Sequence, residues 1–341
     1  MQTVDVKDAH RFDQARLETY LQSNVGGFRG PLSVRQFEGG QSNPTFLLQT
    51  PETAYVLRRK PPGVLVKSAH AVDREFRVMR ALAATAVPVP RVHVLCQDLD
   101  VIGTEFFVMD YISGRVFADP NLPDLQPAER RALIYDYVDT LAKLHQVDLA
   151  AVGLSDYGRP GNYFARQISR WGRQYQETES ERVEEMHSLL AWLEQAVPQQ
   201  TAVSIVHGDF PVGNSLTHPT APRIAAVLDW ELSTTGDPLA DFTYYTGPWH
   251  ARAGDRSLAG KDLHALGIPA YAELVERYCA GTGRDGIPHE AFYRAFHAFR
   301  SAAILQGIIR RAMQGNNAGD MALQFSPVDV RAAAPHGLSY T

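Results

Sequence analysis

The chain has 341 residues, of which 45% are hydrophobic and 21% are charged, and its formal net charge is −5. This length fits one large domain or two lobes with a normal hydrophobic core, which needs no metal or disulfide crosslinks. The mild acidity argues against a nucleic-acid-binding protein, whose affinity would depend on a surplus of Lys and Arg. The two cysteines, Cys96 and Cys279, lie far apart, so they form neither a disulfide framework nor a CxxC motif.

The sequence has no run of about 18 apolar residues, so no membrane-spanning helix is expected. The first residues, MQTVDVKDAHRFD, lack a basic region followed by an apolar one, which argues against a secretory signal. We therefore expect a cytoplasmic protein that has neither a membrane nor a nucleic acid as its partner.

The first third of the chain is predicted to be mostly β. An amphipathic helix over about 9–22 comes first, and turn sequences such as Gly39-Gly40 and Pro61-Pro62-Gly63 separate the runs that follow. A helix over about 69–85 interrupts these runs, because Val72, Phe76 and Met79 recur at helical spacing. The predicted strands are 32–37, 45–50, 55–59, 91–95 and 105–110.

After residue 125 the chain is predicted to be mostly helical. The expected helices are 126–147, 163–176, 180–196, 238–245, 270–279 and 289–314, with two short strands at 204–206 and 224–228. The predicted fold class is therefore α+β, with a small, mostly-β N-terminal lobe (residues 1–110) and a larger, mostly-α C-terminal lobe (residues 111–341). A layout of this kind places a ligand cleft between the lobes.

The most informative segment lies between residues 204 and 245. A short apolar strand runs into His207-Gly208-Asp209, Asn214 follows five residues after Asp209, and a second apolar strand ends on Asp229. This reproduces the spacing H-x-D-x-x-x-x-N of the kinase catalytic loop, followed by a metal-binding aspartate after the next strand.

These residue types suit phosphoryl transfer. Asp209 can accept the proton of an acceptor hydroxyl, while Asn214 and Asp229 offer oxygen atoms to Mg²⁺, which prefers oxygen ligands. His207 is expected to brace the loop and to take no part in the chemistry.

The motifs HGDFPVGN, LDWE and GDPLAD together resemble those of the aminoglycoside phosphotransferase-like family of small-molecule kinases. The resemblance covers nearly the whole chain. It implies a bilobal, protein-kinase-like fold, a nucleoside triphosphate such as ATP as phosphoryl donor, and Mg²⁺.

The same resemblance assigns nucleotide-binding positions in the N-terminal part. The resemblance aligns Gly39, Gly40, Ser42 and Asn43 with the family's nucleotide-covering loop. This loop lacks the complete G-x-G-x-x-G pattern. Glycine there would let the backbone approach phosphate oxygens closely.

Three further features follow from the resemblance: a strand cation, its partner acid and the hinge. The family strand that carries a phosphate-binding cation contains Arg58 here, where many relatives have Lys, and Lys60 is an alternative. Glu75 matches the glutamate that pairs with this cation. The segment Met109–Gly114 matches the hinge between the lobes, where main-chain atoms of Asp110 and Ile112 would meet an adenine edge.

The acceptor is the least determined part of the function. VLRRKPPGVLVKSAHAVDREFRVMRAL and VLDWELSTTGDPLADFTYY resemble the kinase-like domain fused to some acyl-CoA dehydrogenases, and its stand-alone bacterial relatives. This resemblance implies phosphorylation of a hydroxyl group on a hydroxyacyl-CoA. From residue 291 to residue 319 there is no Asp or Glu but there are four arginines, which favours an anionic or neutral acceptor.

Two alternatives stay open. The first is a kinase for another small alcohol of the aminoglycoside, choline or homoserine type. The second is a nucleotide-binding pseudokinase with a regulatory role, which the arginine at position 58 and the incomplete glycine loop would favour.

Overall fold

The computed structural model describes residues 2–38, 43–61, 71–210, 212–251, 257–313 and 336–341. The chain forms two compact units, residues 1–155 with 207–233, and residues 156–206 with 234–341. The segment that carries Asp209, Asn214 and Asp229 thus belongs to the first unit. The expected lobes, 1–110 and 111–341, were defined by their function and stay a prediction.

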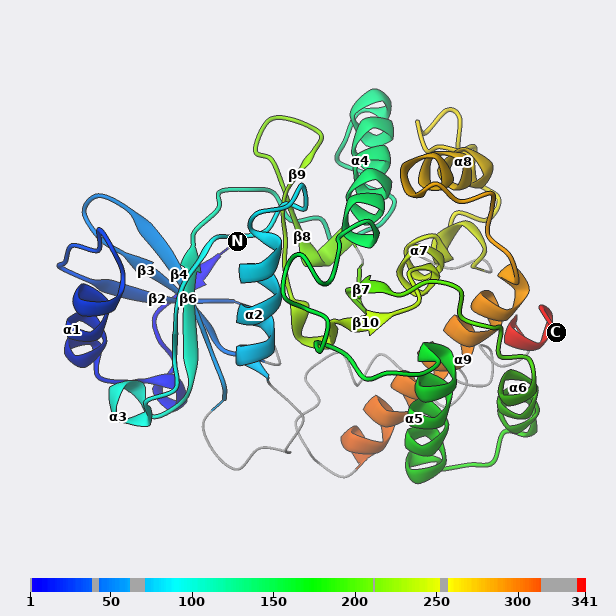
Figure 1. Cartoon of the computed structure of the whole chain (residues 1–341), viewed down its shortest axis with the longest axis horizontal. Helices are drawn as coiled ribbons and strands as arrows, with labels where there is room; N and C mark the ends of the chain where they lie inside the picture. The colour runs from blue at the N-terminus through cyan, green and yellow to red at the C-terminus, as the bar shows by residue number, and fades with distance from the viewer. Residues whose placement is uncertain (1, 39–42, 62–70, 211, 252–256, 314–335) are drawn as a thin grey trace. The chain divides into compact units, whose positions relative to one another are not determined.

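The first unit contains a six-stranded antiparallel sheet in the order β1-β2-β3-β4-β6-β5 (Figure 1). All five strands predicted from the sequence are present, and β1, which has two residues, was too short to predict. The strands are β1 (Thr3–Val4), β2 (Ser33–Phe37), β3 (Thr45–Gln49), β4 (Ala54–Arg59), β5 (Val92–Cys96) and β6 (Phe106–Asp110).

One face of this sheet packs against α1 (Gln14–Asn24) and the short α3 (Leu99–Ile102). Leu17 and Leu21 of α1 are fully buried in this core, together with Leu57 of β4. The helix begins later than the predicted residue 9, because the side chain of Asp13 caps it by accepting a hydrogen bond from the Arg16 amide.

The helix α2 (Val72–Leu82) belongs to the opposite face of the sheet and packs against β5 and β6. Side chains alternate between the two faces along a strand. Since Leu57 of β4 enters the α1 core, Arg58 points to the α2 side, where Glu75 is buried in the helix. The alternation along β4 therefore brings Arg58 and Glu75 together.

The described part of the first unit also contains α4 (Pro127–His145), the hairpin β8 (Ser215–Thr217) and β9 (Ile224–Val227), and the 3-10 turns η1 (Asp8–His10), η2 and η3. The turns η2 (Val212–Asn214) and η3 (Trp230–Leu232) carry the residues of the predicted kinase motif or follow them directly. The predicted helix over 126–147 and the predicted strand over 224–228 are thereby confirmed.

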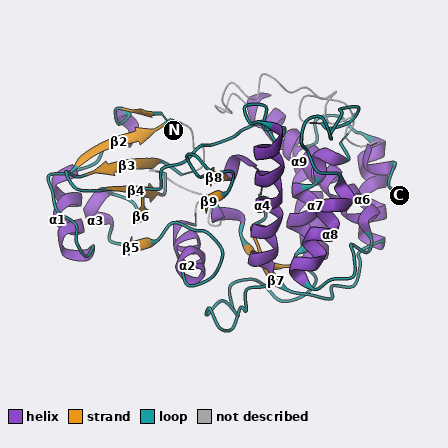
Figure 2. Cartoon of the chain, turned by 90° about the horizontal axis from the view of Figure 1, so that it is seen from above, coloured by secondary structure: helices purple, strands orange, loops and turns teal. Residues whose placement is uncertain are grey.

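The second unit is mostly helical, and α9 (Glu290–Met313) contacts α5, α6 and α7; Figure 2 shows α6 and α7 beside it. Aromatic side chains fill this core, with Phe164 of α5 packed edge-on against Phe292 and Phe296 of α9. None of the described helices is both long and apolar enough to cross a membrane. The other elements are α5 (Tyr163–Thr178), α6 (Glu184–Gln195), β7 (Ser204–Val206), β10 (Thr234–Gly236), α7 (Leu239–Tyr245) and α8 (Tyr271–Thr282).

Candidate active site

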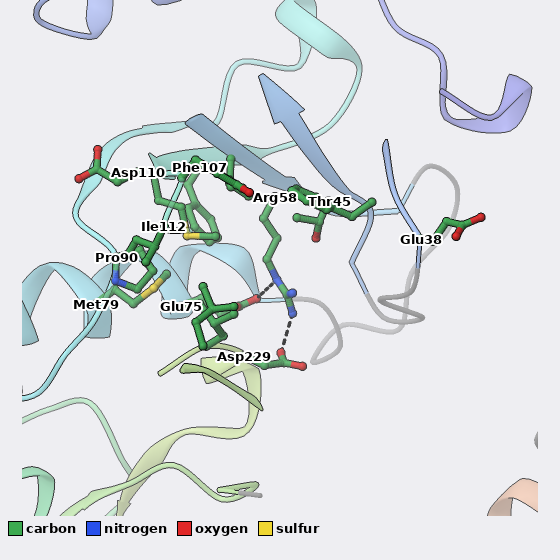
Figure 3. A pocket seen from close by; sticks show the side chains of 16 residues that line it. Glu38, Thr45, Arg58, Glu75, Met79, Pro90, Phe107, Asp110, Ile112 and Asp229 are labelled. Atoms are coloured by element: carbon green, nitrogen blue, oxygen red, sulfur yellow. Dashed lines mark hydrogen bonds and ion pairs between the residues drawn. The ribbon is translucent and has the colours of Figure 1, made fainter. Parts of the chain in front are cut away.

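Arg58 lies at the centre of a cluster of carboxylates in the first unit (Figure 3). Its Nε donates to Glu75 Oε1 at 2.9 Å and its Nη2 donates to Asp229 Oδ1 at 2.6 Å. Glu231 Oε2 lies 3.8 Å from the same Nη2. The structure thus brings together three residues that the sequence predicted, Arg58, Glu75 and Asp229.

Two more contacts close this cluster. Asn43 is fully buried, and its Nδ2 donates to Glu75 Oε1 at 3.2 Å and to Glu231 Oε2 at 3.3 Å. Glu231 was quoted in the motif LDWE but was not predicted to belong to the site. The sequence feature that could have indicated Glu231 is its place two residues after Asp229 in the same motif.

The charge balance of the cluster is uneven. Burial raises the pKa of Glu75 to about 7; the Arg58 guanidinium opposes this shift, and Asp229 and Glu231 add to it. Burial by itself would lower the pKa of Arg58, but the three carboxylates together raise that pKa above its usual value. The oxygen atoms of these carboxylates lie within 4.8 Å of one another, so they could bind a cation jointly.

The predicted catalytic loop is held by its own hydrogen bonds. Asn214 Nδ2 donates to Asp209 Oδ2 at 2.9 Å and to the Asp209 carbonyl at 3.0 Å. The backbone amide of Leu228 donates to the Asn214 carbonyl at 2.8 Å. The loop is therefore bonded to the residue that precedes Asp229. Because Nδ2 of Asn214 makes both bonds to Asp209, Oδ1 is the side-chain atom of Asn214 that could bind a cation.

His207 braces this loop, as predicted. Its Nδ1 accepts a hydrogen bond from the Asp209 amide at 3.3 Å, so the proton is on Nε2, which donates to the Leu228 carbonyl at 2.9 Å. The ring is fully buried and lies 4.6 Å from the ring of Trp230, measured between centroids.

The backbone takes a sharp turn at Asp229, where φ is +62° and ψ is +61°. This left-handed conformation is more accessible to Asp than to most residues. It turns the backbone away from the direction of β9. Trp230 then enters the core with no exposed surface, and Asp229 and Glu231 on either side of it both reach Arg58.

A pocket opens beside the cluster (Figure 3). One part of its wall is apolar, and the other part carries Arg58, Glu75 and Asp229. An apolar slot next to a charged end suits a planar base joined to a charged group. The apolar lining consists of Phe37, Val56, Met79, Pro90, Phe107, Met109, Ile112, Leu216 and Leu228.

The predicted hinge residues Asp110 and Ile112 both line this pocket. The amide of Asp110 donates to the Arg91 carbonyl at 2.9 Å, and its carboxylate accepts from His93 Nε2 at 2.6 Å. The amide of Ile112 has no hydrogen-bond partner within the described part of the chain.

Lys60 lies apart from the carboxylate cluster. Its Nζ donates to Glu105 Oε2 at 2.6 Å, and it does not line the described pocket. Of the two cations that the sequence offered, the geometry therefore favours Arg58. The predicted loop residues Gly39, Gly40 and Ser42 lie outside the described residues.

Comparison with known proteins identifies the family. Residues 33–293 match the phosphotransferase enzyme family. The chain is 48% identical to a Ralstonia eutropha protein described provisionally as an aminoglycoside phosphotransferase; the match covers 97% of this chain and 98% of that chain, with a TM-score of 0.89. The chain therefore belongs to the phosphotransferase enzyme family, whose members are small-molecule kinases, as the motifs had predicted.

More distant structures agree on the fold. A thermostable mutant of aminoglycoside phosphotransferase APH(4)-Ia, in ternary complex with AMP-PNP and hygromycin B, is 18% identical, covers 95% of this chain and 97% of that chain, and has a TM-score of 0.59. The predicted bilobal, protein-kinase-like α+β fold is confirmed.

Among curated proteins, acyl-CoA dehydrogenase family member 11 of Gallus gallus is 42% identical over 98% of this chain. The match covers 44% of that relative, so the chain spans less than half of its length. The predicted likeness to the kinase-like part of these dehydrogenases is confirmed.

Proposed function

We propose that this protein transfers the γ-phosphoryl group of ATP to a hydroxyl group of a small molecule. The observation that carries the proposal is the pocket, in which an apolar slot ends at Arg58, Glu75 and Asp229. The loop of Asp209 and Asn214 is bonded to the residue next to Asp229, so the groups that would activate a hydroxyl belong to the same framework.

In this proposal Asp209 is the base. Asn214 Nδ2 orients the Asp209 carboxylate, which would accept the hydroxyl proton and orient the attacking oxygen. Arg58 would contact the phosphates, with Glu75 holding it in place. Gly39, Gly40 and Ser42 would cover the phosphates, and the lobes 1–110 and 111–341 would close on the nucleotide.

The adenine would lie in the apolar slot. The Asp110 amide is used within the protein, which leaves the Asp110 carbonyl and the Ile112 amide as the acceptor and the donor of the hinge. The charged end of the pocket fits Mg²⁺, because Glu75 and Asp229 offer carboxylate oxygens there, which that ion prefers. Asn214 Oδ1 and Asp229 would hold the ion, which neutralises phosphate charge when it is bound.

For the acceptor we propose a hydroxyacyl-CoA. The support is the likeness to proteins named acyl-CoA dehydrogenases, which are longer than this chain. The arginines of α9 give less support than their number suggested, because Arg294 bonds Glu290 and Arg300 is buried between Trp171 and Tyr244. Acceptors of the aminoglycoside, choline or homoserine type are the alternatives.

The test is an ADP-formation screen with Mg·ATP against hydroxyacyl-CoAs, choline, homoserine and aminoglycosides, followed by substitution of Asp209. We expect Asp209→Asn to abolish turnover and to leave nucleotide binding nearly unchanged. Asp124→Asn, on the exposed surface, is the matched control. Full turnover in the Asp209 variant would refute its role as base.

The same screen addresses the pseudokinase alternative. A wild-type protein that binds ATP measurably but forms no ADP with any acceptor would favour that alternative and count against phosphoryl transfer.

A further inference from the structure

The contacts of Asn43 differ from its predicted role. The sequence placed it in the loop that touches the nucleotide. In the structure its side chain is fully buried and does not line the described pocket. Its amide nitrogen donates instead to Glu75 Oε1 and Glu231 Oε2, at 3.2 Å and 3.3 Å.

The chemistry of the side chain explains why an amide suits this position. Carboxylates only accept hydrogen bonds, so the NH₂ group of Asn43 must face both of them, and it has one proton for each. A serine hydroxyl would supply a single proton, and an aspartate would add a further negative charge. The position calls for a short neutral group with two donors.

The two carboxylates need such a group because they face each other. Their oxygens lie within 4.8 Å of each other and of an Asp229 oxygen, and Arg58 is the cation bonded to this cluster in the described residues. Like charges at this separation repel, and more strongly when they are shielded from water. Glu75 is 1% exposed and Glu231 is 22% exposed, so water screens them only in part.

We infer that Asn43 is a positioning residue and not a ligand of the nucleotide. Its amide holds Glu75 and Glu231 together and thereby keeps the Arg58 guanidinium in position. The inference rests on the proposed function, since it assigns how the phosphate-binding cation is kept in place. Glu75 Oε1 accepts from both Asn43 and Arg58, so a shift of this carboxylate moves the guanidinium as well.

A double-mutant cycle tests this role. The variants are Asn43→Ala, Glu231→Ala and the double variant, each measured by urea unfolding of nucleotide-free protein in EDTA and by steady-state kinetics. We expect Asn43→Ala to lower both the folding equilibrium constant and kcat by about 10- to 100-fold when Glu231 is present. Without Glu231 the loss should be only about threefold, because one of the repelling carboxylates is gone.

Nucleotide affinity separates a positioning residue from a ligand. Because Asn43 would act through Arg58, Asn43→Ala should weaken the affinity for ATP when Arg58 is present but change it by less than about threefold in an Arg58→Ala background, as the exposed control Asn24→Ala does. A tenfold weaker affinity in the Arg58→Ala background would overturn the inference, and so would independent, fully additive free-energy losses in the Asn43→Ala, Glu231→Ala double variant. If Asn43→Ala does not fold, Asn43→Ser, which keeps one donor, takes its place in the cycle, and its loss should be the smaller of the two.

The two proposals fail in different ways. A chain that transfers no phosphate but shows the coupling in its unfolding would refute the proposed function alone. An active protein in which the losses caused by Asn43→Ala and Glu231→Ala are independent of each other would refute the role of Asn43 alone.

Discussion

Replacing Glu75 by glutamine should stabilise the protein increasingly as the pH rises from 5 to 8. Burial raises the pKa of this carboxyl from 4.5 to about 7, so between these values the folded protein binds more protons than the unfolded chain. Stability that depends on Glu75 is therefore present at low pH and is lost as the pH rises through this window. Glutamine has the shape of the protonated acid and does not titrate.

The magnitude follows from the same values. Ionising a buried carboxyl with this pKa costs roughly 3 kcal/mol at pH 8 and less than about 1 kcal/mol at pH 5. The free energy of unfolding of Glu75→Gln relative to wild type should thus increase by roughly 2 to 3 kcal/mol from pH 5 to pH 8. Any constant difference between glutamine and neutral glutamate, such as a weaker bond from Arg58, is the same at every pH.

The assay is urea unfolding at pH 5, 6, 7 and 8 in EDTA, which keeps divalent cations away from the cluster. The control is Glu194→Gln, an exposed position on α6 whose substitution should show no such trend. A Glu75→Gln advantage that does not change with pH, or that shrinks toward pH 8, would refute the reasoning. The same variant should lose turnover, since a neutral side chain holds Arg58 less firmly.

Three further outcomes follow from the geometry. His250 Nε2 accepts a hydrogen bond from Arg294 at 3.0 Å and its pKa is lowered to about 4 by burial and by that guanidinium, so its contribution to stability is lost as the pH falls from 6.5 to 4. His250→Gln should reduce this acid sensitivity in urea titrations. Lys60→Ala should change kcat/KM for ATP by less than about threefold, because Lys60 is bonded to Glu105, whereas Arg58→Ala should cost about 100-fold. Gly208→Ala should lower the free energy of unfolding by about 1 to 3 kcal/mol, because φ is +82° there and an added Cβ would lie 2.9 Å from a backbone oxygen; an unchanged melting temperature would contradict this.

The sequence predicted the elements that are long enough to show a period. The five main strands of the sheet and the helices of the second unit lie close to their expected positions. It did not predict β1, β8, β10 or α3, which have two to four residues and are too short for a periodic pattern. The start of α1 was predicted too early, since a side-chain cap at Asp13 sets it.

Local spacing alone selected Asp209, Asn214 and Asp229, because the residues of this motif lie on one short loop and at the end of the next strand. The backbone hydrogen bond between Leu228 and Asn214 joins those two segments as the spacing suggested. The tertiary structure favours Arg58 over Lys60. The strand β4 ends at Arg59, so Lys60 leaves the face on which Arg58 meets Glu75.

The contacts of Asn43 and Glu231 could not be read from the sequence, because 188 positions separate them and neither belongs to the spacing of the catalytic motif. A motif records residues that act from one short segment, and it predicted the reaction class of this protein and proposed Asp209 as the base. Which buried charges face one another depends on how strand, helix and turn are packed. The tertiary structure alone therefore determined how Arg58 is held and which carboxylates surround it.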